Sequence, residues 1–371
     1  MVDLLSENTC EANEIIRILA VGDVMLGISS LRSIAEGNTI PSLLVNDCKS
    51  MLIGVKPCLE NKDILFGNLE CTISKNHYNC DDNNPRFLMA PIEAVSFLKY
   101  GDFDILNLAN NHILDHGIDK VIETVNILEN EGFHIIGAPY TKFESDLCVL
   151  EIKNKKIGFL GFNLCGEGKS SKISIILQSI KENREIVDIL ILSLHWGWEY
   201  EYSPKPSSEQ IRMAHAFIDA GVDIILGHHS HVFQSIEHYQ GKVIAYSLGN
   251  FIFDMEYENC LSGILEIFIG QNNEISFKEV PIKQINYKLQ LSEKGSEVAL
   301  HMASTYDFNS QIINETNPKY RKKYRKKHNK DILYYYLSNF YKFSIAFHIA
   351  TISRWSKKIL KSSFNCIKSR S

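Results

Sequence analysis

Short apolar runs alternate with amphipathic helical segments along most of this chain, and this alternation limits its fold class more than any other feature. The runs predicted to form strands are residues 15–21, 63–67, 104–108, 133–136, 156–162, 187–194, 222–226 and 242–247. Helices are predicted between them, for example at 41–59, 91–99, 118–131 and 207–220. Such alternation is typical of a largely parallel sheet covered by helices. Because 227–282 has short strands without intervening helices, we expect antiparallel pairing there, and an α/β sandwich of two sheets flanked by helices accommodates both patterns.

Charge is divided unevenly between the body of the chain and its C-terminal end. Residues 319–371 contain 15 Lys or Arg and one acid, Asp331, whereas the rest of the chain has 24 basic and 43 acidic side chains. A composition shift of this size indicates a boundary. The basic residues flank an aromatic and aliphatic stretch at 332–355 with enough apolar positions for one helical face.

Cysteine usage and the absence of targeting signals indicate an intracellular protein. The nine cysteines include no Cys-x-x-Cys pair, which argues against a zinc ribbon and a disulfide scaffold. The N-terminus has no basic segment before its first apolar run, and no apolar stretch is long enough to span a bilayer. We therefore expect a cytoplasmic location, with peripheral contact at the inner membrane surface as an option for the basic tail.

Six polar clusters, each directly after a predicted strand, carry the candidate functional residues. They occupy residues 20–27, 66–70, 106–117, 192–200, 221–232 and 245–254. In open α/β sheets, ligands bind outside the carboxyl ends of the strands. The third cluster is the densest, because six Asn, His and Asp side chains crowd one strand-to-helix junction.

The fifth cluster runs from a strand straight into His228, His229 and His231. In an extended stretch His229 and His231 would point to the same side, and imidazole is the commonest protein metal ligand. His228 is expected to be a neighbour, outside the set of ligands. Taken together, the clusters offer Asp, Asn, Glu and His but no sulfur, which suits Mn, Fe or Zn in a hydrolytic site better than a structural zinc.

The ordered series GDVMLG, NLE, NNHILDHG, HWGWEY, GHHSHV and YSLGNFIFD resembles the CapA family of bacterial capsule-synthesis and poly-γ-glutamate biosynthesis proteins. That family is similar in fold to the calcineurin-like metallophosphoesterases, which form a two-sheet sandwich flanked by helices. The resemblance covers about residues 15–285. We expect an N-terminal segment at 1–14, this domain at 15–285, an irregular connection at 286–318 and a basic helical tail at 319–371.

The resemblance also implies roles for individual residues. It implies metal ligation by Asp23, Asn111, His195, His229 and His231, and we add Asn68 and Glu70 of the second cluster as candidate ligands. His112 matches a histidine that protonates a leaving group, with Asp115 as its orienting carboxylate. The pattern departs at two positions: Met25 stands where metallophosphoesterases have a histidine, and Asn68 where they have a bridging aspartate. Glu70 is expected to supply the anionic ligand that Asn68 does not. The number of bound ions, one or two, stays open.

Function is therefore expected to be that of a metal-dependent hydrolase of capsule or poly-γ-glutamate biosynthesis, acting on a γ-glutamyl amide or a phosphoester. The alternative is a non-catalytic polymer-binding, export or scaffold component, which the two departures favour. The expected partner is an acidic polymer such as polyglutamate. For the tail, we weigh packing on the acidic body and contact with a membrane surface equally. Binding of nucleic acid ranks below both, since no nucleic-acid recognition motif accompanies the charge.

Overall fold

The computed structural model describes residues 15–37, 39–76, 88–138, 147–166, 168–197, 206–254 and 260–292, and parts of the C-terminal region at 326, 330, 332–345, 347–349 and 351–353. Expectations for residues 1–14, for Trp198, and for most of 293–331 and 354–371 lie outside the described residues.

The larger sheet contains the strand that opens the described part of the chain. Its order is β16 (Lys288–Leu291), β15 (Ile275–Ile285), β14 (Cys260–Ile269), β1 (Ile16–Val24), β2 (Ile64–Leu69), β5 (Ile105–Asn107) and β6 (His134–Ile136), and β13 (Asn250–Ile252) also pairs with β1. The strands β1, β2, β5 and β6 are parallel, whereas β14, β15 and β16 add antiparallel pairs at one edge.

The second sheet has a parallel centre with an antiparallel strand at each edge. Its order is β11 (Ile236–Tyr239), β12 (Lys242–Ala245), β10 (Ile224–His228), β9 (Ile189–His195), β8 (Lys155–Asn163) and β7 (Cys148–Ile152). A separate two-stranded sheet pairs β3 (Thr72–Ser74) with β4 (Met89–Pro91).

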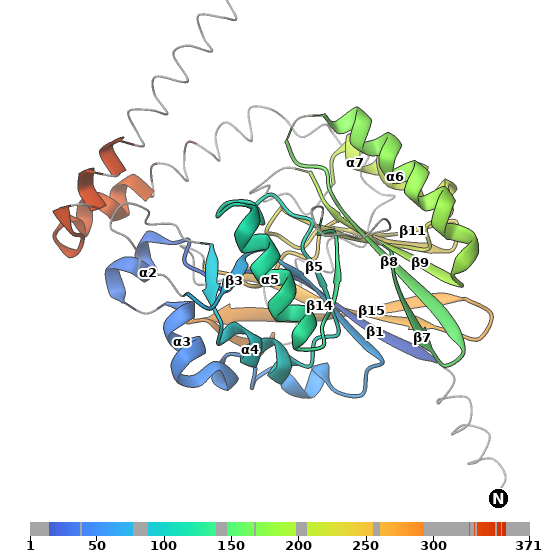
Figure 1. Ribbon diagram of the computed structural model, residues 1–371, viewed down its shortest axis with the longest axis horizontal. Helices are drawn as coiled ribbons and strands as arrows, with labels where there is room; N and C mark the ends of the chain where they lie inside the picture. The colour runs from blue at the N-terminus through green and yellow to red at the C-terminus, as the bar shows by residue number, and fades with distance from the viewer. Residues whose placement is uncertain are drawn as a thin grey trace, which may run out of the picture.

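Helices cover the outer faces of both sheets (Figure 1). They are α2 (Leu31–Glu36), α3 (Ile40–Asp47), α4 (Ala94–Gly101), α5 (Ile118–Asn130), α6 (Lys169–Asn183) and α7 (Ser208–Asp219), with short 3₁₀ turns η1 (Cys48–Met51), η2 (Lys56–Leu59), η3 (Arg184–Ile186) and η4 (Phe340–Lys342). None of the described helices is both long and apolar enough to cross a membrane.

Strand periodicity builds three apolar layers. On β1, Ile18 and Ala20 join the core between the two sheets, whereas Leu19 and Val21 join the core under α3, α4 and α5. This alternation is the two-residue period of a strand buried on both faces. A third core packs α6 and α7 on the second sheet. The α/β class is thereby confirmed, with two sheets face to face and helices outside.

All eight predicted strands overlap observed ones, and the antiparallel pairing expected within 227–282 is found between β11 and β12 and between β14 and β15, but two expectations were wrong. A tight turn at Gln240 and Gly241, both with positive φ, joins β11 to β12, which also pairs in parallel with β10. The helix expected over 41–59 ends at Asp47, whose side chain accepts from the N–H of Ser50 and begins η1. The chain is also non-helical at Gly54, which lies so close to β16 that a Cβ there would be 2.5 Å from the carbonyl oxygen of Leu289.

The segment expected to be irregular from 286 onward begins instead with a turn and the strand β16. Asn286 and Tyr287, with φ of 47° and 61°, form a two-residue turn that returns the chain as β16. Hairpin turns of this kind usually carry glycine, so the local residue pattern does not indicate a turn here.

Candidate metal centre

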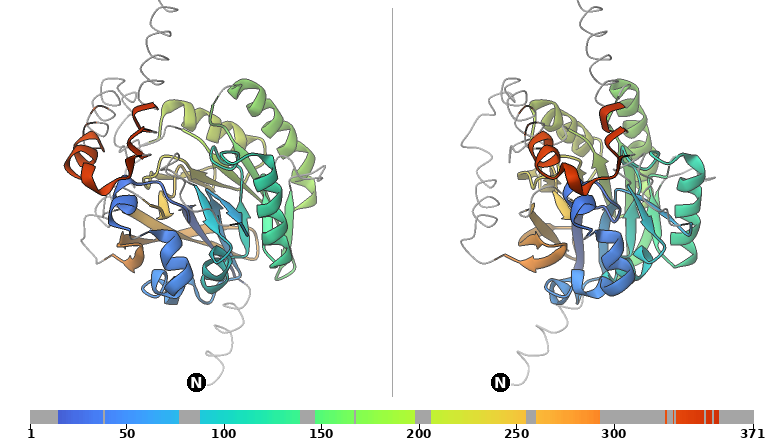
Figure 2. Two further views of the ribbon diagram at one scale, coloured as in Figure 1. Left: turned by 60° about the vertical axis from the view of Figure 1, so that its left-hand side comes forward. Right: turned by 90° about the vertical axis from the view of Figure 1, so that its left-hand side faces the viewer.

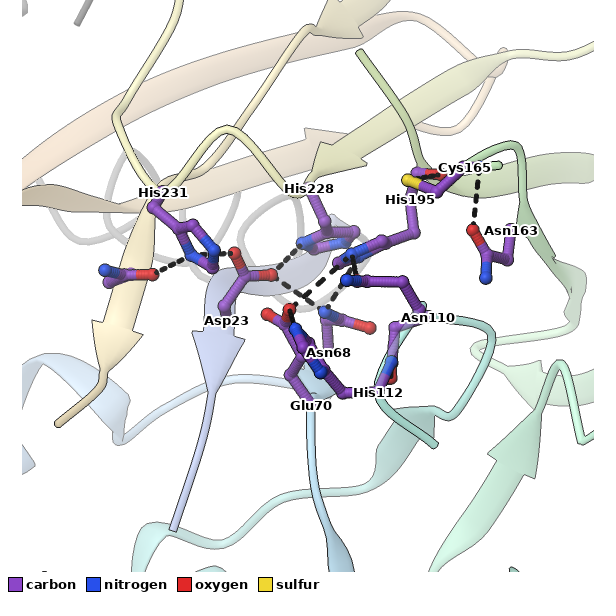
Figure 3. A network of polar contacts seen from close by, with 12 residues as sticks. Asp23, Asn68, Glu70, Asn110, His112, Asn163, Cys165, His195, His228 and His231 are labelled. Atoms are coloured by element: carbon purple, nitrogen blue, oxygen red, sulfur yellow. Dashed lines mark hydrogen bonds and ion pairs between the residues drawn. The ribbon is translucent and has the colours of Figure 1, made fainter. Parts of the chain in front are cut away.

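Two rows of polar side chains lie at the carboxyl ends of the parallel strands. In the larger sheet, the register neighbours across β13, β1, β2 and β5 are Asn250, Asp23, Asn68 and Asn107. In the second sheet, the register neighbours across β8, β9 and β10 are Asn163, His195 and His228. Because the two sheets face each other, the rows converge on one buried cluster (Figure 3).

Asp23 is the acidic centre of the first row and is fully buried. Its Oδ1 accepts a 2.7 Å hydrogen bond from Asn68, and its two oxygens lie 3.5 Å from Nδ1 of His228 and 3.4 Å from Nδ1 of His231. Burial alone would raise the pKa of Asp23, but the contacts with the two histidines outweigh it and hold the pKa well below its ordinary value. The carboxylate is therefore ionised and faces two imidazole rings.

Asn68 connects the two rows. Its amide nitrogen donates to Asp23 and lies 3.4 Å from Nδ1 of His195, while its oxygen accepts a 2.9 Å bond from Asn107. The carboxylate fixes this orientation, because only the amide N–H can face it. The oxygen that would coordinate an ion is thus occupied by Asn107.

His195 lies at the end of β9 and is fully buried. Its Nε2 is 2.6 Å from Oδ1 of Asn111 and 3.6 Å from Oε1 of Glu70, which is itself fully buried just beyond β2. Burial, together with the nearby His229, holds the pKa of His195 well below its ordinary value. A neutral imidazole beside a carboxylate and an amide oxygen is the form that binds a metal.

His112 stands at the rim of the same cluster. Its Nδ1 lies 2.8 Å from Oδ2 of Asp115, which is exposed, and its Nε2 lies 3.8 Å from Oε1 of Glu70. The loop that holds it is fixed by Asn110, whose side chain accepts from the N–H of His112 and donates to the carbonyl of Leu69. One ring nitrogen thus faces the buried cluster and the other faces the rim.

The two histidines that follow β10 at 229 and 231 take conformations that differ from the expected extended one. His229 and His231 have φ of 89° and 59°, in the left-handed region that side chains other than glycine rarely adopt. His231 lies 2.9 Å from Oδ1 of Asn250, and the ring of His229 lies 4.7 Å from that of His195. His228 is fully buried and reaches Asp23. Strained backbone at a buried polar turn is characteristic of functional sites.

The donor set fits a divalent cation. Asp23, Glu70 and His195 each offer a ligand atom, and these atoms lie within 4.8 Å of one another at fully buried positions. In the described part of the chain, both ring nitrogens of the buried His228 and Nδ2 of Asn250 have no hydrogen-bond partner. Buried polar atoms of this kind call for a further partner such as water or an ion.

Other motif residues serve packing rather than the cluster. Met25 is fully buried in the core under α3, α4 and α5, and its sulfur accepts from the N–H of Gly27. Trp196 stacks on Tyr246 and donates to that residue's carbonyl. Asp254 accepts from the N–H groups of Ser29 and Ser30, ahead of α2.

Sequence reasoning missed Asn163 and Cys165. Both lie at or just after the end of a predicted strand, so the strand-end rule that selected the six clusters could have found them. Cys165 is relevant to the site because its thiol and ring nitrogens of His195 and His229 form a second group of candidate ligand atoms within 4.8 Å.

Comparison with known proteins places the chain in a family. Residues 17–255 match the family described as bacterial capsule synthesis protein PGA_cap. The chain is 30% identical over 287 residues to the PGA biosynthesis protein CapA of Bacillus subtilis (strain 168), covering 73% of this chain and 72% of that protein. It is also 30% identical over 292 residues to the capsule biosynthesis protein CapA of Bacillus anthracis, covering 73% and 68%. The chain therefore belongs to the bacterial capsule synthesis, or CapA, family, as its six motifs predicted.

Solved structures offer only distant likenesses. A hypothetical protein from Thermus thermophilus aligns with a TM-score of 0.49 at 13% identity, over 72% of this chain and 100% of that one. The sulfate thiohydrolase SoxB of the same organism aligns with a TM-score of 0.38 at 8% identity, over 78% of this chain and 60% of that one. Neither likeness bears on function.

Proposed function

We propose that this chain is a metal-dependent hydrolase of capsule or poly-γ-glutamate biosynthesis that cleaves a γ-glutamyl amide or a phosphoester. The observation that carries the proposal is the buried convergence of Asp23, Glu70 and His195 beside Asn111, with His112 facing the same point. The names of the relatives supply the polymer, because two of them are a PGA and a capsule biosynthesis protein.

The fold supports this assignment through the position of the cluster. Two facing sheets with ligand-type side chains at their carboxyl ends support the metallophosphoesterase-like arrangement that the motifs imply. That arrangement gathers ligands from separate strands, so no single loop has to supply them all.

A single divalent ion, Mn, Fe or Zn, would be held between Asp23, Glu70 and His195, beside Asn111, with His229 and His231 as the remaining candidate ligands. Since the oxygen of Asn68 is turned to Asn107 and Met25 is in the core, a second ion near Asp23 would lack ligands there. A divalent ion in this position supplies Lewis-acid stabilisation of developing negative charge.

The remaining chemistry falls to the chain's own side chains. Asp115 accepts a hydrogen bond from the protonated Nδ1 of His112, so the proton that moves to a leaving amine or alkoxide is the one on Nε2. Glu70 lies near both rings, with its Oε1 3.8 Å from Nε2 of His112 and 3.6 Å from Nε2 of His195. The buried position of His195 and Asp23 keeps bulk water away from the ligand side of the site.

A non-catalytic polymer-binding or export role is the second candidate. It is favoured by the same two departures, because Asp23 already accepts a hydrogen bond from Asn68 and lies within 3.5 Å of two imidazole rings. In that case the cluster would be a structural network that needs no ion.

Metal content and polymer cleavage in the same preparation separate the two candidates. We expect one divalent ion per chain after dialysis against Mn²⁺ or Zn²⁺, and release of new amino groups from poly-γ-glutamate or of phosphate from an ester. Asn111→Ala and His231→Ala should reduce both readouts, whereas His215→Ala, which changes a histidine on α7 paired with Glu237, should reduce neither. Wild-type protein that binds no stoichiometric ion, and whose stability and turnover ignore added Mn²⁺ and Zn²⁺, would establish the non-catalytic role.

A further inference from the structure

Cys165 lies against the histidine side of the proposed metal site. The turn that carries it follows β8 and is held to the end of β9, because the N–H of Leu164 donates to the carbonyl of His195 at 2.9 Å. The N–H of Cys165 donates to Oδ1 of Asn163 at 2.8 Å, and its thiol lies 3.5 Å from that same His195 carbonyl. These bonds fix the sulfur beside His195, as Figure 3 shows.

The sulfur completes a triangle of ligand atoms. Those of Cys165, His195 and His229 lie within 4.8 Å of one another. Ligands of a tetrahedral zinc ion stand roughly 3.3–3.8 Å apart, given Zn–N and Zn–S bonds of about 2.0–2.3 Å. The three side chains would have to draw closer together than the 4.8 Å limit to share one ion.

We propose that Cys165 is a ligand of the ion held by His195 and His229, and that its thiolate makes this ion zinc rather than manganese. The inference rests on the metal site of the proposed function and decides among its three candidate ions. Thiolate is a soft ligand that favours zinc over manganese, whose preferred partners are oxygen atoms. Neither the six motifs nor the relatives' names point to a sulfur ligand.

Cobalt substitution tests the proposal without an activity assay. Metal-free full-length protein is titrated with Co²⁺, and the near-ultraviolet charge-transfer band of a thiolate–cobalt bond is recorded. We expect the band in wild type and in Cys148→Ser, which changes a half-buried cysteine on β7, and its loss in Cys165→Ser. Zinc affinity should fall on the order of 10–100-fold in Cys165→Ser, the range seen even for groups that only support a ligand, while manganese affinity stays unchanged.

The outcomes separate this inference from the proposed function. Stoichiometric Co²⁺ binding without a thiolate band overturns the role of Cys165 and leaves the metal site standing. No Co²⁺ binding in wild type overturns both.

A second inference comes from an unrelated region, the described residues between 332 and 353, called the C-terminal hairpin below. Its two helical segments contact each other through Tyr336 and His348, whose polar atoms lie 2.6 Å apart. Tyr336, Phe343 and Phe347 pack on Leu31 of α2. Figure 2 shows the hairpin beside α2, which directly follows β1, so it lies toward the carboxyl ends of the strands.

The opposite face of the hairpin is apolar and exposed. Eight of the eighteen exposed large hydrophobic side chains in the described chain fall in this short region: Leu333, Tyr334, Leu337, Phe340, Tyr341, Ile345, Ile349 and Ile352. Tyr341 is 81% exposed and Ile345 79%. Such a concentration marks an interaction surface.

The charge of the C-terminal region indicates which partner the exposed apolar face binds. Residues 319–371 combine 15 basic side chains with one acid. Pairing of two copies through this face would bring like charge against like charge, because a two-fold interface places the same patch on both sides. An anionic lipid surface instead accepts apolar and aromatic side chains together with flanking Lys and Arg.

We infer that the C-terminal hairpin docks the protein on an anionic membrane surface. Full-length protein is sedimented with vesicles of phosphatidylcholine alone or mixed with phosphatidylglycerol. We expect pelleting only with the anionic vesicles, reduced by salt, and reduced by at least tenfold in the double variant Ile345→Glu and Ile349→Glu. Ile175→Glu, at an exposed isoleucine on α6, should pellet as wild type does.

Equal pelleting of the hairpin variant and wild type overturns this inference. So does a wild-type protein that stays in the supernatant and forms dimers that the hairpin variant abolishes, since the face would then join two copies.

Discussion

The side-chain amide of Asn68 donates a 2.7 Å hydrogen bond to the fully buried carboxylate of Asp23, its register neighbour on the adjacent strand. Its oxygen is in turn occupied by Asn107. The amide provides Oδ1 of the aspartate with a hydrogen-bond donor, which a carboxylate at this position could not do, while Oδ2 has no hydrogen-bond partner among the described residues. The hydrogen bond between Asn68 and Asp23 therefore explains how the cluster folds although Asn68 stands where the metallophosphoesterase pattern has an aspartate.

Asn68→Asp should make folding of this cluster dependent on metal. It replaces the donor by a second carboxylate next to Asp23, and loss of a hydrogen bond to a charged group costs about 1.5–3 kcal/mol before any repulsion. We expect a lower melting temperature in EDTA and a larger upward shift on adding Mn²⁺ or Zn²⁺ than in wild type. Differential scanning fluorimetry with and without metal measures both.

Asn183→Asp is the matched control, because it also replaces a buried amide that donates a hydrogen bond, to the carbonyl of Ser179 on α6, and lies away from the metal site, so its melting temperature should not depend on metal. Equal melting temperatures of Asn68→Asp and wild type in EDTA would contradict the assigned role of the amide.

Local patterns in the sequence predicted the strands and the clusters, because both depend on neighbouring residues. A buried strand such as β9 is largely apolar until its final His195, and that change is visible in the sequence. What joins the clusters is the pairing of Asp23 with Asn68, and of His195 with His228, across neighbouring strands. These registers depend on tertiary packing, which no local pattern encodes.

The histidine triplet shows where such reasoning failed. A two-residue spacing predicts that His229 and His231 share a side only if the backbone is extended, and both have positive φ instead. His228, expected to be a neighbour of the ligands and not a ligand itself, is the last residue of β10 and lies 3.5 Å from Asp23. Backbone strain at these positions depends on the surrounding fold, so the sequence could not reveal it.

Catalysis, if it follows the proposed chemistry, should depend on the proton at Nε2 of His112. His112→Gln removes the proton donor at a position 23% exposed in its side chain, so the fold should tolerate the change. We expect kcat to fall by about 10²–10⁴-fold, the usual contribution of a general acid, with metal content unchanged. Steady-state kinetics on the polymer, with metal analysis of the same sample, measures both.

Asp115→Asn separates positioning from proton transfer, because it weakens only the 2.8 Å contact with Nδ1. A smaller loss of kcat and a shifted pH profile are expected. A turnover unchanged in both variants would exclude His112 as the acid.

Asp254 should contribute to stability rather than to the site. It accepts from the N–H groups of Ser29 and Ser30 and from Tyr287, whose hydroxyl lies 2.9 Å away, and it also bonds Ser33 of α2. Asp254→Ala leaves these donors unmatched, at about 1–3 kcal/mol for each buried one. We expect the free energy of unfolding to fall by about 3 kcal/mol in a urea titration.

Asp219→Ala, which removes an exposed acceptor of Tyr239 and Gln240, should change the free energy of unfolding little. A small effect of Asp254→Ala would mean that water replaces the lost acceptor.

Glu279 on β15 should make the stability of the protein depend on pH. Burial raises the pKa of its carboxyl to about 8, and its Oε1 has no hydrogen-bond partner among the described residues. In the unfolded chain the carboxyl ionises near its ordinary pKa of roughly 4.3. Between these values the folded state binds the extra proton, so its stability falls as pH rises from about 4.3 to about 8 and then levels off.

Glu279→Gln keeps the shape of the side chain and removes its titration. The free energy of unfolding of this variant minus that of wild type should therefore grow steadily across that window, with the variant the more stable at pH 8. Urea titrations at intervals of pH measure the difference, and Glu129→Gln, at an exposed position of α5, controls for the loss of one negative charge. Because the control carboxyl is in water in both states, its difference from wild type should stay nearly flat. Parallel curves for the two variants would mean that Glu279 is solvated in the folded protein and that its strand edge admits water.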